Sequence, residues 1–114
     1  MNELKSVQTL TAFAVHRKVS IMKILIIEPF FGGSHQQWAQ GFQQHSSHEV
    51  DILSMKAHNW KWRMYGGAVS LAKQFMELKE LPDFILATDM LDFTTFLALT
   101  RSRTANIPTA IYFH

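Results

Sequence analysis

From Met22 onward, short apolar runs alternate with segments of helical spacing. The run KILIIE at 23–28 has four consecutive apolar residues between Lys23 and its final acid, which is typical of a strand buried on both faces. Similar short runs predict strands at 48–53, 84–88 and 109–113. The pattern therefore predicts four strands.

Helical periodicity occupies the segments between these runs. In 34–45, Trp38 and Phe42 are four residues apart, and Ser34 is a natural N-cap with Gln37 three residues later. A second helix carries an apolar stripe of Ala68, Leu71, Ala72, Phe75 and Leu78. A third helix is predicted at 90–101, and a polar, aromatic loop at 54–67 precedes the second.

Four alternations of strand and helix with short links predict stacked βαβ units. The expected fold class is therefore α/β: a Rossmann-like, three-layer α/β/α arrangement with a parallel sheet of about four strands. Ligands of such sheets collect beyond the carboxyl ends of the strands. Polar segments follow all four predicted strands, namely EPFFGGSH, SMKAHNWKWRM, TDMLD and a final His. Any function should lie on that rim.

Composition narrows the class of protein. The 114 residues suit one small domain, and a net charge of +2 with six histidines permits contact with nucleic acid without arguing for it. The absence of cysteine excludes disulfides and thiolate metal sites and favours a reducing, cytoplasmic location. No apolar run approaches the roughly 20 residues that span a bilayer, so no membrane partner is expected.

Residues 1–21 form a leader with only a short apolar patch, LTAFAV. An acid precedes the patch and no small-residue cleavage pattern follows it, which disfavours a signal peptide. Because Met22 stands directly before the first strand, we expect the leader to be disordered or weakly helical, or to reflect a mis-assigned start. The folded domain is predicted at 22–114.

The segment FFGGSH joins the first strand to the first helix. Gly32 and Gly33 would let the backbone approach a ligand, and the N–H groups near Ser34 would attract an anion. The alternative is that both glycines only supply positive φ for a tight turn. His35 adds a titratable group, although a lone loop histidine is more often an ordinary hydrogen-bonding residue. The segment matches no named nucleotide-binding fingerprint.

Two further segments carry candidate binding residues. KAHNWKWRM places Trp60, Trp62 and Arg63 together, which suits stacking on bases or sugars and contact with phosphate, or else one anchoring tryptophan and solvated cations. TDMLD places Asp89 and Asp92 at a helix start, where Asp89 as N-cap and Asp92 in the first turn would favour the helix dipole. The functional alternative is an acid pair that binds sugar hydroxyls. No metal-ligand spacing is visible.

Four of these segments, taken in order, resemble a known family. ILIIEPFFGGSH, HNWKWRM with GGA, ATDMLDFTTFLAL and the terminal P-AIYFH are similar to the N-terminal domain of the tRNA-queuosine α-mannosyltransferases. The similarity covers 22–114, and each segment stands at the end of a predicted strand.

The resemblance implies an enzyme, a glycosyltransferase of the GT-B type, in which two Rossmann-like domains hold a nucleotide-sugar donor and an acceptor. The donor would be GDP-mannose, the acceptor queuosine in tRNA, and no cofactor or metal would be needed. His35, Asp89 and His114 would be catalytic. The substrate-binding residues would be Gly32, Gly33, Ser34, Trp60, Trp62, Arg63 and Asp92.

The main departure from the family is that the chain stops at His114, where members continue into a donor-holding C-terminal domain. The chain would then be a truncated N-terminal, acceptor-side domain that is inactive alone. The alternative is a non-catalytic Rossmann-like module that binds RNA or a nucleotide through HNWKWR.

Overall fold

The computed structural model describes residues 21–56 and 60–113, although the side chains of Lys56 and of residues 60–66 lie outside that description. The prediction of a leader at 1–21 falls almost wholly outside these residues and stays a prediction. No helix in the described part of the chain combines the length and the apolar character needed to cross a bilayer.

Four strands form one sheet in the order β2-β1-β3-β4, and every neighbouring pair is parallel. The predicted α/β class with a parallel sheet is therefore confirmed. Strands and helices alternate along the chain as β1 (Lys23–Phe31), α2 (Gly33–His45), β2 (Glu49–Lys56), α3 (Trp60–Met76), β3 (Phe84–Thr88), α4 (Phe93–Thr104) and β4 (Thr109–Tyr112).

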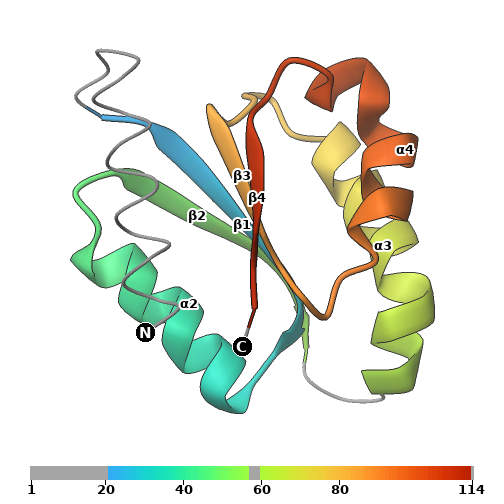
Figure 1. The fold of residues 1–114 in the computed structure, drawn as a ribbon, viewed down its shortest axis with the longest axis horizontal. Coiled ribbons are helices and arrows are strands. Elements are labelled where there is room, and N and C mark those ends of the chain that lie inside the picture. The colour runs from blue at the N-terminus through green and yellow to red at the C-terminus, as the bar shows by residue number, and fades with distance from the viewer. Residues whose placement is uncertain (1–20, 57–59, 114) are drawn as a thin grey trace.

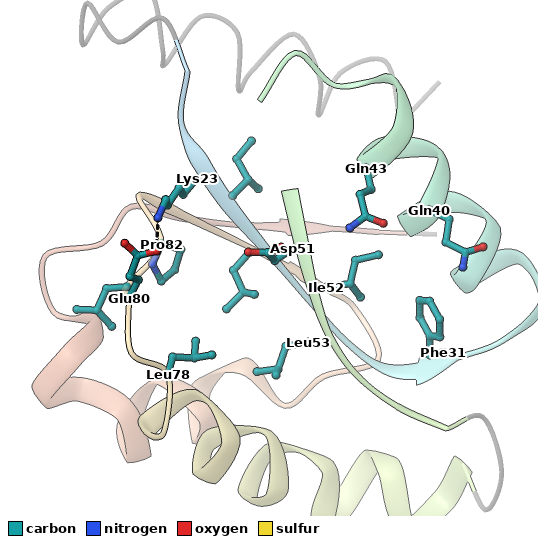
Figure 2. Close-up of a pocket in the computed structure, with 13 residues that line it drawn as sticks. Lys23, Phe31, Gln40, Gln43, Asp51, Ile52, Leu53, Leu78, Glu80 and Pro82 are labelled. Carbon is teal, nitrogen blue, oxygen red and sulfur yellow. Dashed lines mark hydrogen bonds and ion pairs between the residues drawn. The ribbon is translucent and has the colours of Figure 1, made fainter. Parts of the chain in front are cut away.

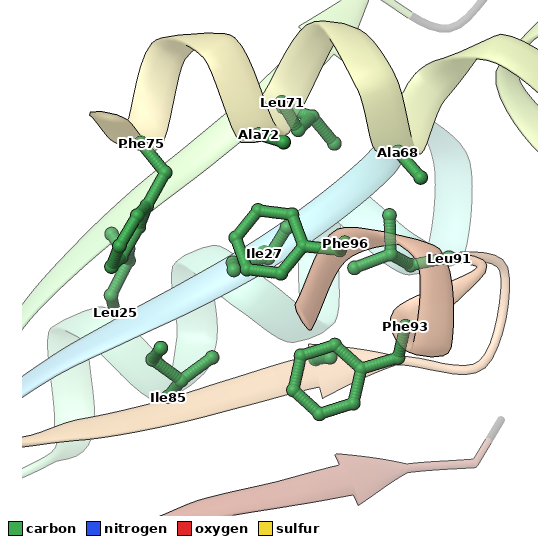
Figure 3. Close-up of a cluster of buried hydrophobic side chains, with 11 residues drawn as sticks. Leu25, Ile27, Ala68, Leu71, Ala72, Phe75, Ile85, Leu91, Phe93 and Phe96 are labelled. Carbon is green, nitrogen blue, oxygen red and sulfur yellow. The ribbon is translucent and has the colours of Figure 1, made fainter. Parts of the chain in front are cut away.

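The helices cover both faces of the sheet, with α2 on one side and α3 and α4 on the other (Figure 1). Because side chains alternate along a strand, β1 serves two cores. Ile24 and Ile26 pack on the α2 side with Trp38 and Phe42. The opposite core contains the apolar stripe of α3 and the aromatic rings of α4, and Figure 3 shows these side chains converging on β1 and β3. Its buried members are Leu25, Ile27, Ala68, Leu71, Ala72, Phe75, Ile85, Ala87, Leu91, Phe93 and Phe96.

The predicted loop at 54–67 is wrong at both ends. Strand β2 continues to Lys56, because β1 also runs on to Phe31 and offers it a partner. The register shifts between Glu28 and Phe31, around Pro29, which has no N–H to donate to the ladder. Helix α3 begins at Trp60, since the residues from there to Tyr65 include no helix breaker.

The predicted N-caps also need correction. Helix α2 begins one residue before Ser34, with Gly32 at the cap position and no side-chain cap hydrogen bond. Helix α4 begins at Phe93, and its N-cap is Asp92 rather than Asp89. The carboxylate of Asp92 accepts hydrogen bonds from the Thr95 amide at 3.1 Å and from the Thr95 hydroxyl at 2.7 Å.

One arginine joins the two helices on the second face. The Arg103 guanidinium, in the last turn of α4, donates to the carbonyl oxygens of Met76 at 2.9 Å and Leu78 at 2.8 Å, and to that of Phe75 at 3.2 Å. The last carbonyls of a helix have no partner within the helix. Arg103 therefore closes the C-terminal end of α3 from the neighbouring element.

Replacing this arginine should destabilise the domain. We expect Arg103→Ala to lower the free energy of unfolding by about 1–3 kcal/mol, because several charge-assisted hydrogen bonds are lost. Arg101→Ala, on an exposed position of the same helix turn, should change it by less than about 0.5 kcal/mol. Urea unfolding followed by circular dichroism measures both, and equal effects would contradict the interhelical role.

Candidate functional site

The strand order places a topological switch point between β1 and β3. From β1 the chain moves outward to β2, then returns across β1 to β3 and continues to β4. The connections after β1 and β3 therefore leave toward opposite faces of the sheet, which opens a crevice at their carboxyl ends. Because the strands are parallel, the segments that follow them all start from the same edge of the sheet, as the sequence predicted. This edge, the rim, is the candidate site.

Residues near the carboxyl ends of neighbouring strands lie next to one another at this rim. The pairs Glu28–Ser54 and Thr88–Tyr112 are in register, and Ile27 pairs with Ala87 immediately before Glu28 and Thr88. Glu28 and Thr88 consequently occupy neighbouring positions of β1 and β3 on the face covered by α2.

Glu28, Thr88 and His35 form a hydrogen-bonded cluster, which we call the Glu28 cluster. Glu28 and Thr88 are fully buried, whereas the His35 side chain is 17% exposed. Glu28 Oε1 lies 2.7 Å from His35 Nδ1, and Oε2 accepts hydrogen bonds from the Thr88 hydroxyl at 2.9 Å and the Phe30 amide at 3.1 Å. The cluster joins β1, β3 and the first turn of α2.

Aromatic rings border the cluster. Phe30 meets the His35 ring edge-on with 5.7 Å between centroids. One helical turn further along α2, Trp38 stacks on Tyr112 of β4 with 4.0 Å between centroids and 17° between planes. Because His35 and Trp38 are three residues apart on one helix, the stacked pair fixes the face of α2 that presents His35 to Glu28.

The glycine turn above the cluster has the backbone freedom that the sequence suggested, although in one residue only. Gly33 has φ +53, whereas Gly32 is extended with φ −168. A Cβ built on Gly33 meets nothing within 4 Å. Gly33 and Ser34 stand in the first turn of α2, whose N–H groups have no intrahelical partner. This arrangement suits an anion without identifying one.

Asp89 and Asp92 follow β3 and are both exposed. The Asp89 amide donates to the Tyr112 carbonyl at 3.0 Å, so its backbone extends the β3–β4 ladder to the rim. The hydrogen bond from the Thr95 hydroxyl, together with that from the Thr95 amide, lowers the pKa of Asp92 below its ordinary value of 3.8. Asp92 therefore has a structural role that its proposed binding role must accommodate.

The remaining predicted residues lie partly outside the described structure. Trp60, Trp62 and Arg63 occupy the first turns of α3, directly after β2 and a short connection, but their side chains are among those not described. His114 follows β4 and is also outside the description. Within residues 21–56 and 60–113, no three His, Asp or Glu side chains gather as potential ligands of one metal ion.

A groove of about 450 Å³ lies elsewhere, along the open edge of β2 (Figure 2). Phe31, Gln40 and Gln43 border it on one side, and the ion pair between Lys23 and Glu80 closes its far end. None of the predicted site residues lines it. The groove and the rim are separate features.

Comparisons with known proteins identify the family. The family model "tRNA-queuosine alpha-mannosyltransferase N-terminal" matches residues 23–114. The chain belongs to this family. A tRNA-queuosine alpha-mannosyltransferase from Drosophila melanogaster is 33% identical over 92 residues, which make up 80% of this chain and 24% of the fly protein. The chain thus spans about a quarter of this relative's length, and no solved structure matches it.

Two members of the Glu28 cluster were not among the predicted site residues. Glu28 ends the predicted strand KILIIE, in which residues 24–27 are all apolar, and Thr88 likewise ends FILAT. The sequence signal for them was a polar residue at the last position of each of two predicted buried strands. Only the strand order shows that these two residues are neighbours.

The two glycines of α2 that the structure describes provide a test of the turn. We expect Gly33→Ala to lower the free energy of unfolding by about 1–2 kcal/mol, because its left-handed backbone disfavours any Cβ even where space is open. Gly41→Ala, in the interior of α2 with similarly open space, should instead raise it by about 0.5–1 kcal/mol. Thermal and urea unfolding measure both, and destabilisation by Gly41→Ala would show that space, not φ, decides.

The stabilisation that the Asp92 cap gives to α4 should be lost in acid. Because the pKa of Asp92 is lowered from 3.8, the stabilisation by its ionised form is complete above that value and is lost as pH falls through the folded-state pKa. We expect Thr95→Val to raise the pKa of Asp92 toward 3.8, while Thr94→Val, at the exposed neighbouring position, leaves it unchanged. An NMR titration of the Asp92 carboxyl carbon distinguishes the two variants. An equal response would refute the assignment of the cause.

Proposed function

We propose that the protein made from the whole gene transfers a hexose, mannose from GDP-mannose, to queuosine in tRNA. This chain would supply the N-terminal, acceptor-side domain of a GT-B glycosyltransferase, and the donor would be held mainly by a C-terminal domain. The observation that carries the proposal is the family match across residues 23–114. A chain without cysteine is consistent with a cytoplasmic reaction.

The proposed substrate contacts are assigned to the residues of the rim. The N–H groups of Gly33 and Ser34 would lie near the donor's phosphate or the transferred sugar, since the first turn of a helix favours anions. His35, Asp89 and His114 would bind hydroxyls or assist proton transfer. Much of the rate would come from orienting the two substrates and stabilising the departing diphosphate. No metal ion is required in this scheme.

The acceptor would meet the chain at the start of α3. Trp60 or Trp62 would stack on a base or a sugar, and Arg63 would neutralise phosphate charge. Gly32 would allow the backbone to approach the substrate, and Asp92 would bind a hydroxyl while capping α4. These roles are proposals that rest on the family's motifs and on the placement of their backbone at one rim.

The transfer itself is testable with radiolabelled GDP-mannose. We expect the whole gene product to label tRNA that contains queuosine and to leave tRNA lacking queuosine unlabelled, while the 114-residue chain alone transfers nothing. Failure to transfer any hexose to any RNA, from any nucleotide sugar, would overturn the proposal.

Binding measurements separate the enzyme from a binding module. In a filter-binding assay, Arg63→Ala should weaken the binding of tRNA, measured as its retention on the filter, several-fold, because one phosphate contact is lost. Lys73→Ala, at an exposed position in the last turn of α3, should leave retention unchanged. Retention of tRNA that depends on Arg63, without sugar transfer by the whole gene product, would favour a non-catalytic RNA-binding module.

A further inference from the structure

Among the described residues, Glu28 is the one charged side chain that is fully buried. Removing a carboxylate from water is costly unless hydrogen bonds or opposite charge replace the lost hydration. The strand end could hold an apolar residue here, as the preceding positions of β1 do. The location beneath the glycine turn and against His35 points to a role in the site.

The donors around Glu28 indicate how its oxygens are used. The Phe30 amide can only donate, and it donates to Oε2 together with the Thr88 hydroxyl. Both of these donors suit an ionised carboxylate, which accepts at both oxygens. His35 Nδ1, 2.7 Å from Oε1, then carries the proton of the hydrogen bond that joins the two side chains.

A proton on Nδ1 determines what the rest of the ring can do. In a neutral imidazole that carries its proton on Nδ1, Nε2 holds a lone pair and accepts hydrogen bonds. The His35 side chain is 17% exposed, whereas Glu28 is fully buried. The Glu28 contact thereby decides whether the rim offers an acceptor or a donor at His35.

We propose that Glu28 is a positioning residue that holds His35 in the Nδ1–H tautomer, so that Nε2 accepts a hydrogen bond from a sugar hydroxyl at the rim. This inference rests on the proposed function and deepens it, because it assigns one hydrogen-bond polarity to one atom of the site. Thr88 and the Phe30 amide orient the carboxylate from the side opposite His35.

Glu28→Gln should reverse this polarity rather than abolish the contact. The Phe30 amide requires an acceptor at the Oε2 position, so the glutamine oxygen should take that place and its NH₂ group should face His35. Nδ1 would then accept, and the proton would move to Nε2. Thr88→Val removes a neighbouring hydrogen bond to Glu28 but leaves the His35 contact, which makes it the matched control.

The tautomer can be measured on the 114-residue chain by long-range ¹H–¹⁵N correlation NMR at a pH where imidazoles are neutral. The His35 signals are assigned by their loss in His35→Asn. We expect Nδ1–H in the wild type and in Thr88→Val, and Nε2–H in Glu28→Gln. A wild-type ring with its proton on Nε2 would overturn the proposal, and this readout requires no sugar transfer. It therefore remains valid if the proposed function fails.

Steady-state kinetics of the whole gene product then test the consequence. We expect Glu28→Gln to lower kcat/KM at least roughly tenfold, because Nε2 would then carry a proton and could no longer accept the hydrogen bond from the substrate hydroxyl. Thr88→Val should lower kcat/KM less. A rise in KM for GDP-mannose would place the hydroxyl on the donor, and a rise in KM for tRNA would place it on the acceptor.

A second variant covers the case in which Glu28→Gln does not fold. In His35→Asn, the side-chain NH₂ group stands near the Nδ1 position and keeps a donor for Glu28, but no acceptor remains where Nε2 was. We expect near-wild-type stability with kcat/KM reduced at least roughly tenfold. Unchanged kcat/KM in a folded His35→Asn protein would overturn the proposal.

Discussion

The pairing of β1 with β3 is the constraint on which the site depends. It is a crossover pairing, because β2 intervenes in the sequence, and it joins residues 60 positions apart, Glu28 and Thr88. With helices on both faces, β3 is buried along its whole length and β1 is buried from Ile24 to Pro29. A shift of one residue would turn the apolar side chains of β1 to the opposite cores and separate the two strand ends. Packing of the two cores therefore also fixes the geometry of the rim.

The conformation of the glycine turn depends on its contacts with Glu28 as well as on its own residues. Gly33 supplies the positive φ that lets the chain enter α2 directly after β1. Glu28 then connects to both sides of that turn, to the Phe30 amide before the glycines and to the His35 ring after them. The position of the α2 N-terminus therefore depends both on the hydrogen bonds of Glu28 and on the positive φ of Gly33.

Sequence reasoning captured what periodicity encodes. Ala68, Leu71, Ala72 and Phe75 of the predicted stripe are buried, and β3 has its predicted bounds, because apolar spacing directly reports burial. The fifth predicted member, Leu78, lies beyond the end of α3 and is only partly buried. The N-caps were misplaced because Ser and Asp suit several neighbouring positions, and only the packing of each helix on the sheet selects one. The loop at 54–67 was misread because tryptophan and charged residues fit both a rim loop and the start of a helix. His35 was recognised by residue type, whereas its partners depend on strand order.

The position of Glu28 also explains why its role was hidden in an apolar pattern. A charged residue at the end of a strand normally marks the point where the strand reaches solvent. Here β1 continues past Pro29 to Phe31, so Glu28, the last residue in register before the ladder shifts, remains inside the protein. An acid followed by proline is thus an ambiguous signal for the end of a strand. Whether its side chain is buried depends on whether the neighbouring strand offers a hydrogen-bonding partner beside it. Thr88 is that partner, and its hydroxyl makes the strand end polar enough to retain the carboxylate beside His35.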